Sequence, residues 1–283
     1  MSKQDDFFVG YLPTPKAIAG FYRLAIPLIA LIALTVGAWI AMGQQSAGQG
    51  IWDVSEKQEI TGFLTVDPYP VIHLVGEDQR SVILVQQGKH SAFDKAHPFA
   101  DSWVSISGYA ITRGDWSMLE IPPSSDFVRE ASNSSLNLSP ELLGEITLQG
   151  EIIDSKCFLG VMKPGYGKTH RACAAMCLLG GMPPMFVVKS TTGERFGYLL
   201  TQEDGTSASL ELVNNVAVPV SLTGQLEKRG DMLYIRYDKS RVTRLSAAEL
   251  VDYGELITAD SGINPNQEVI MTADTHSEGT HEH

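Results

Sequence analysis

The stretch ISGYAITRGDWSMLEI at residues 106–121 recurs without a gap as LTGQLEKRGDMLYIRY at residues 222–237. In both repeats an Arg-Gly-Asp turn, beginning at Arg113 and at Arg229, separates two runs rich in alternating apolar residues. Alternation of this kind around a short turn with glycine predicts a β-hairpin. The chain is therefore expected to contain the same β unit twice.

Further strands are expected before the hairpin in each repeat. In the first repeat the predicted strands are residues 60–66, 71–75, 81–86, 103–112 and 116–121. The segment ITGFL from Ile60 matches LQGEI from Leu148, and residues 71–86 match residues 185–201. Each repeat is thus predicted to contribute five strands.

The second repeat is longer than the first. Its extra residues fall between its first and second strands, at residues 154–184. The sequence predicts one domain at residues 57–122 and another at residues 144–245. A segment rich in Ser and Asn, residues 123–143, is typical of a linker between them.

Five strands with a short connection before the fourth resemble an OB-fold, a small closed barrel. The resemblance covers about residues 60–122 and 145–245, and it rests on the strand pattern and the duplication. It implies a mainly β protein with two tandem five-stranded OB-like barrels. Ligands of OB-folds commonly contact the loop between strands one and two, where the second repeat carries a helical Cys/His insertion. A β-sandwich built from the same strands is the alternative fold.

An apolar run precedes both predicted domains. Residues 24–42 contain no charged residue and are long enough to cross about 30 Å of hydrocarbon as a helix. Lys and Arg flank this run closely on its N-terminal side only, which predicts that residues 1–23 are cytoplasmic. Residues 43–56 would then tether domains that are periplasmic or extracellular. This pattern resembles a single-pass bacterial-type membrane anchor, and a cleaved signal peptide is the alternative.

The C-terminal segment, residues 246–283, is expected to form a short helix followed by a disordered tail. Ser246 and Glu249 have the spacing of a capping box, which opens a helix. The residues after Gly254 are mostly polar, so little apolar surface is available to fold them.

The composition limits the classes of function. The net charge is −12 at pH 7, whereas nucleic-acid binding needs a basic footprint. The stretch GYGKT at residues 165–169 lacks the earlier glycine of a P-loop, so no nucleotide is expected. We find no Ser-His-Asp order and no carboxylate pair with a suitable separation. The sequence therefore does not point to an enzyme.

All three cysteines lie within residues 154–184. A helix is predicted from His170 to Leu179, and it places His170, Cys173 and Cys177 on one face. Cys157 is expected to approach from the end of the preceding strand. The four side chains predict a metal site with three cysteines and one histidine.

The ligand types suit zinc or an iron–sulfur cluster. Copper(I) prefers sulfur ligands, and methionines such as Met182 and Met185 lie nearby. Those methionines are more typical of an apolar cap at the barrel mouth, which makes copper the weaker choice.

Two other interpretations of the insertion remain open. Outside the cytoplasm, Cys157 would be expected to form a disulfide with Cys173 or Cys177. A thiol redox site is also possible, although no CxxC is present. The insertion is basic, and its basic residues are candidates for contact with an anion or an acidic partner: Lys156, Lys163, Lys168 and Arg171.

Together these features predict a membrane-anchored, extracytoplasmic protein with a metal-binding or redox-linked role. We expect it to be an accessory subunit of an envelope or respiratory assembly, with a membrane or envelope protein as partner. The alternative is a non-catalytic interaction module whose basic loop is held by a structural disulfide.

Overall fold

The computed structural model describes residues 16–43, 50–75, 80–132, 136, 138–189, 195–208 and 210–246. The chain divides into two compact units, residues 1–47 and 48–283, and each is described by itself. Most of the predicted cytoplasmic segment, and the predicted helix and tail after Ser246, lie outside the described residues.

The first unit contains one helix, α1 (Lys16–Gly43). The most apolar 18-residue window within residues 18–42 has a mean hydropathy of 2.4, and none of that window is buried within the protein. By length and composition this helix could be a membrane anchor or a signal sequence. It begins at Lys16, several residues before the predicted start at Leu24.

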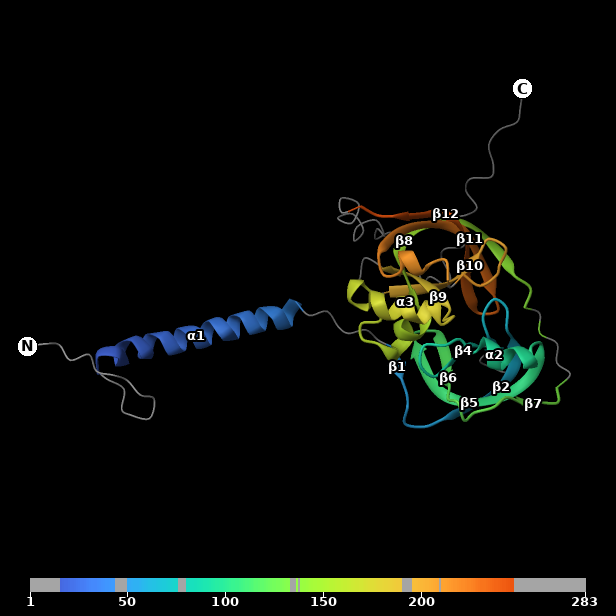
Figure 1. Ribbon diagram of the computed structural model, residues 1–283, viewed down its shortest axis with the longest axis horizontal. Helices are drawn as coiled ribbons and strands as arrows, with labels where there is room; N and C mark the ends of the chain where they lie inside the picture. Colours follow the sequence, from blue (N-terminus) through green and yellow to red (C-terminus); the bar gives the residue numbers. More distant parts are fainter. Residues whose placement is uncertain are drawn as a thin grey trace, which may run out of the picture. The chain divides into compact units, whose positions relative to one another are not determined.

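The second unit begins with a closed five-stranded barrel (Figure 1). Its elements are β1 (Ile51–Trp52), β2 (Gln58–Thr65), β3 (Val71–His73), β4 (Ser81–Gln86), α2 (Phe93–Ala96), η1 (His97–Phe99), β5 (Ser102–Arg113), β6 (Trp116–Ile121) and β7 (Val128–Arg129). Strands β2, β3, β4, β6 and β5 pair in that cyclic order, and β5 returns to β2. Only the β4–β6 pairing within this barrel is parallel.

A second closed barrel follows with the same cyclic order of strands. Its elements are β8 (Glu141–Asp154), η2 (Cys157–Val161), η3 (Lys168–His170), α3 (Arg171–Leu179), β9 (Pro184–Lys189), β10 (Arg195–Gln202), η4 (Val213–Asn215), β11 (Pro219–Arg229) and β12 (Met232–Arg244). Strands β8, β9, β10, β12 and β11 close on themselves, with β10 and β12 parallel. The prediction of a mainly β protein with two closed five-stranded barrels is confirmed, and the sandwich alternative is wrong.

The registers of the two barrels match residue by residue. Tyr109 pairs with Glu120 in the first barrel, and the corresponding Gln225 pairs with Arg236 in the second. A Cβ at Gly108 would lie 2.6 Å from the Glu120 carbonyl oxygen. A glycine at this position lets the backbone of the neighbouring strand come close.

Two predicted loops take part in the first barrel. Ile51 and Trp52, at the end of the predicted tether, pair with β5. Val128 and Arg129, in the predicted linker, pair with β5 as well. Strand β5 is longer than its main partners, so unpaired backbone groups remain along it, and these short strands satisfy them.

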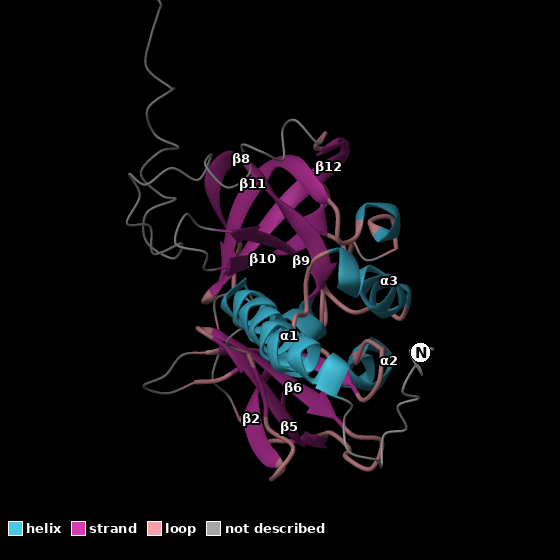
Figure 2. Cartoon of the chain, turned by 90° about the vertical axis from the view of Figure 1, so that its left-hand side faces the viewer, coloured by secondary structure: helices cyan, strands magenta, loops and turns pink. Residues whose placement is uncertain are grey.

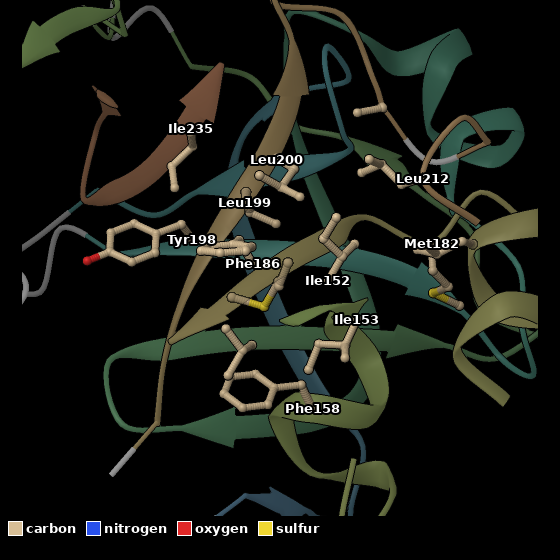
Figure 3. Close-up of a cluster of buried hydrophobic side chains, with 14 of the residues drawn as sticks. Ile152, Ile153, Phe158, Met182, Phe186, Tyr198, Leu199, Leu200, Leu212 and Ile235 are labelled. Atoms are coloured by element: carbon tan, nitrogen blue, oxygen red, sulfur yellow. The ribbon is translucent and has the colours of Figure 1, made fainter. Parts of the chain in front are cut away.

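The two barrels pack against each other through apolar side chains. Tyr69, Val71 and Ile83 of the first barrel belong to the same buried cluster as the core of the second. Figure 3 shows that core, with Phe158 of η2 close to Ile153 of β8. Across the contact, the Ser81 amide donates to Asp231 at 3.0 Å. The residues that follow β8, such as Phe158, therefore lie at the contact between the two barrels.

Candidate metal centre

The candidate site is built on the connection from β8 to β9. Asp154 is the last residue of β8, and Cys157 lies three residues later in the η2 turn rather than at the end of the strand. His170 ends η3, and Cys173 and Cys177 follow on α3. Figure 2 shows α3 outside the strands of the second barrel.

The predicted site residues fall into two overlapping groups. The ligand atoms of Cys157, His170 and Cys173 all lie within 4.8 Å of one another. Those of Asp154, Cys157 and Cys177 do so as well. Cys157 is common to both groups, so a Cys/His/Asp cluster that could hold a metal ion is present.

The four predicted ligands do not form a single group. His170 and Cys177 are seven residues apart, which places them about 10 Å apart along a helix axis. Helical spacing puts both on one face, but it also separates them by two turns. His170 approaches Cys157 from the N-terminal end of α3, whereas Cys177 approaches Cys157 from the C-terminal half of that helix.

Asp154 is one of two site residues that were not predicted from the sequence, the other being Lys89. Its side chain is fully buried, its Oδ2 lies 2.9 Å from His170 Nε2, and its Oδ1 accepts the Cys157 amide at 2.9 Å. A carboxylate in this position orients a histidine and fixes its tautomer. With Nε2–H donating to Asp154, the other ring nitrogen, Nδ1, is the lone-pair donor. The only signal in the sequence was an acidic residue three positions before Cys157, and it does not show that the side chain is buried.

The three sulfurs are thiols in close proximity. None of the cysteines forms a disulfide, and the Cys157 and Cys173 Sγ atoms are 3.9 Å apart. Cys157 and Cys177 are buried, whereas Cys173 is partly exposed. The exposed edge of the cluster is therefore at Cys173.

The first barrel contributes a lysine to this cluster. Lys89 Nζ lies 2.7 Å from Cys173 Sγ and 3.5 Å from Cys177 Sγ. Its hydrogen bond to Cys173 raises the pKa of Lys89. The pKa of Cys177 is lowered, first because the Cys157 thiol donates to its sulfur and further by Lys89. The same thiol–thiol hydrogen bond, together with burial, raises the pKa of Cys157.

Contacts on both sides of the cluster fix the position of Lys89. Lys156 Nζ donates to the carbonyl oxygens of Gln86 and Gly88, at 2.9 and 2.8 Å. The Ser91 amide donates to Gly180 O at the C-terminal end of α3. The loop that carries Lys89 is thus held between residues on either side of the cysteines.

The basic residues of the insertion divide into two kinds. Lys156 is buried and pairs with Glu120 at 2.6 Å, both side chains being 3% exposed. It therefore joins the two barrels and does not face an anion or partner in solution. Lys163, Lys168 and Arg171 are exposed.

The geometry supports binding of a metal ion at a site shared by the two barrels. Sulfur, nitrogen and oxygen donors converge there, and a cation lies beside the thiols. No family model matches the chain, and no curated protein or solved structure is significantly similar to it.

Proposed function

We propose that this chain is a membrane-anchored metal-binding protein whose second barrel holds a single zinc ion. The proposed ligands are Cys157, His170 and Cys173. This set is narrower than the three cysteines and one histidine that the sequence predicts. A fourth position is then open to water or to another ligand, as in sites where zinc keeps one free position.

The separation of two sulfur atoms carries this proposal. Two thiolates bound to one tetrahedral zinc at about 2.3 Å lie about 3.8 Å from each other. The Cys157 and Cys173 Sγ atoms are 3.9 Å apart. A disulfide would require about 2.05 Å. The two sulfur atoms are therefore separated by the distance expected for two ligands of one zinc ion.

The charges around the site favour a divalent ion. Thiolates at Cys157 and Cys173 and the Asp154 carboxylate would carry three negative charges, and Lys89 carries one positive charge. A divalent ion brings this buried group to neutrality, which matters because uncompensated charge is costly away from water. An iron–sulfur cluster usually takes four cysteines, and this chain has three.

The setting of the site supports an extracytoplasmic, accessory role. In both barrels the third and fifth strands are parallel, which supports an OB-like identity. The site lies between strands one and two, where OB-folds commonly bind ligands. Lys16 and Arg23 lie on the N-terminal side of the apolar run, and the next basic residue after it is Lys57, a pattern that favours barrels outside the cytoplasm. The exposed Lys163, Lys168 and Arg171 offer a basic face to an acidic partner in an envelope or respiratory assembly.

Metal analysis of the full-length protein in detergent tests the zinc proposal. We expect one zinc per chain under reducing conditions, and a loss of zinc in Cys173→Ser and His170→Ala. Asp154→Asn should weaken zinc binding by about 10–100-fold, because it removes the acceptor that orients His170.

Two variants serve as controls. Cys177→Ser should keep the zinc, because Cys177 is outside the proposed ligand group. His97→Ala changes an exposed histidine of the first barrel and should have no effect. A protein that binds no metal and has one free thiol would instead favour the interaction module with a structural disulfide.

A further inference from the structure

The contact between Lys89 and Cys173 is closer than an ordinary hydrogen bond to sulfur. Lys89 Nζ and Cys173 Sγ are 2.7 Å apart, which is at the short end even for N–H···O bonds, although sulfur is the larger atom. The second sulfur, Cys177 Sγ, lies 3.5 Å from the same nitrogen. The amine and Cys173 are therefore placed at a distance that one intervening oxygen atom would span.

We propose that Lys89 and Cys173 are a site of oxidative modification, where dioxygen converts the pair into a covalent N–O–S cross-link. The Lys89 ammonium, the Cys173 thiolate and one dioxygen molecule give the cross-link and one water. One oxygen atom forms the bridge, and the other leaves as water with two of the three ammonium protons. Nitrogen and sulfur each lose one electron pair, and dioxygen accepts both pairs.

Accessibility selects Cys173 among the three cysteines. Cys157 and Cys177 are 3% and 1% exposed, whereas Cys173 is partly exposed. Oxidation of a cysteine follows its thiolate character and its access to the oxidant. Cys173 is the accessible sulfur, and it is also the sulfur that the Lys89 amine contacts, at 2.7 Å.

Geometry favours the lysine over a disulfide as the second partner. A Cys157–Cys173 disulfide would require the sulfurs to close from 3.9 Å to about 2.05 Å. Cys157 is buried, and its amide is fixed by Asp154. Lys89 is already at bridging distance, at the end of a flexible stem. The cross-link requires little movement of the amine, whereas the disulfide requires the two sulfurs to approach from 3.9 Å to about 2.05 Å.

The cross-link would join the two barrels covalently. Lys89 belongs to the connection after β4 of the first barrel, and Cys173 lies on α3 beside the second. The inference does not depend on the proposed zinc function. If zinc does bind Cys173, the two states exclude each other, because a bridged sulfur is no longer a thiolate ligand.

Mass spectrometry of the metal-free, full-length protein tests this inference. One sample is kept anaerobic, the other is incubated in air, and both are digested without reduction. In air we expect a cross-linked peptide pair that contains Lys89 and Cys173, heavier than the sum of the two peptides by one oxygen and lighter by two hydrogens. The free thiols should fall from the three of the reduced chain by one, and a thiol reductant should restore them.

Conservative variants test the assignment. Lys89→Arg keeps the positive charge but replaces the amine with a guanidinium, and it should abolish the cross-link, as should Cys173→Ser. Lys95→Arg is the matched control, because Lys95 of the same barrel contacts the Ser125 carbonyl and Asp126 and no thiol. Three free thiols after incubation in air, or a Cys157–Cys173 disulfide in place of the N–O–S product, would overturn the inference. Zinc binding is measured on a separate anaerobic sample to which zinc is added back, so failure of either proposal can be recognised separately.

Discussion

At the residue scale, the site could be predicted only in part. His170 and Cys173 follow from helical spacing, because residues three apart share a helix face. Lys89 could not be predicted, because it lies in the other repeat and only the packing of the two barrels brings it to Cys173. Asp154 lay within the stretch of interest, but nothing in its sequence position shows that its side chain points inward to His170.

A second buried histidine leads to a prediction about pH. His73 Nδ1 is 2.9 Å from Ser81 Oγ, and its Nε2 is 3.0 Å from Thr65 Oγ1. Burial lowers the pKa of His73 from 6.5 to about 4, against a smaller opposing effect of Asp231. The unfolded chain then binds the proton more readily than the folded one. The stabilising contribution of neutral His73 is complete above about pH 6.5 and is lost as the pH falls toward 4, by at most about 3 kcal/mol.

Urea unfolding between pH 7 and pH 4 measures this contribution. We expect the free energy of unfolding of the wild-type protein to fall more steeply with decreasing pH than that of His73→Gln. The exposed His97 provides the control, and His97→Gln should follow the wild-type slope. Equal slopes for wild type and His73→Gln would show that His73 does not titrate as proposed.

At the scale of elements, the repeated hairpin was the most informative part of the sequence. Its glycines recur because the barrels require close backbone contact at equivalent places, as at Gly108 and Gly224. Strands β1 and β7 escaped prediction because each has two residues, too few for an alternating pattern to appear. The η2 turn was not predicted either, because it is only five residues long. Cys157 was predicted on a strand, but the chain turns before reaching it.

The end of α3 leads to a prediction about packing. A Cβ at Gly180 would lie 1.7 Å from the Lys89 carbonyl oxygen, and backbone atoms of this loop have little freedom to move. We expect Gly180→Ala to lower the stability of the barrels by about 1–3 kcal/mol, as for other overpacked sites, and to displace Lys89 from Cys173. Thermal unfolding measures the first effect. Gly37→Ala is the control, because a Cβ at Gly37 meets nothing within 4 Å. A fully stable Gly180→Ala protein would show that α3 can move away from Lys89.

At the scale of the whole molecule, residues 48–283 form one compact unit, and the candidate site lies at the contact of its two barrels. The sequence predicts two tandem domains with a linker, which alone would suggest independent units. The buried cluster instead includes Tyr69 and Ile83 of the first barrel and the core of the second. The first barrel also supplies Lys89, which contacts Cys173. It therefore contributes a residue to the site, in addition to having the same strand order as the second barrel.

The buried ion pair between Lys156 and Glu120 should decide how firmly the barrels are joined. Both side chains are 3% exposed, and Glu120 also accepts the Trp52 indole N–H at 3.1 Å. Lys156→Met leaves that carboxylate without its cation and should destabilise the protein by about 3–5 kcal/mol. Lys156→Met combined with Glu120→Leu should recover part of this loss, since neither charge then remains buried.

Arg241→Met, which breaks the exposed pair with Glu145, is the control. It should leave the unfolding midpoint unchanged, because exposed ion pairs contribute little. Denaturant unfolding of the wild type, Lys156→Met, the double variant and Arg241→Met measures these differences in stability. A double variant as unstable as Lys156→Met would mean that the lysine acts mainly through the Gln86 and Gly88 carbonyls, and the joining role would then pass from the ion pair to those two hydrogen bonds.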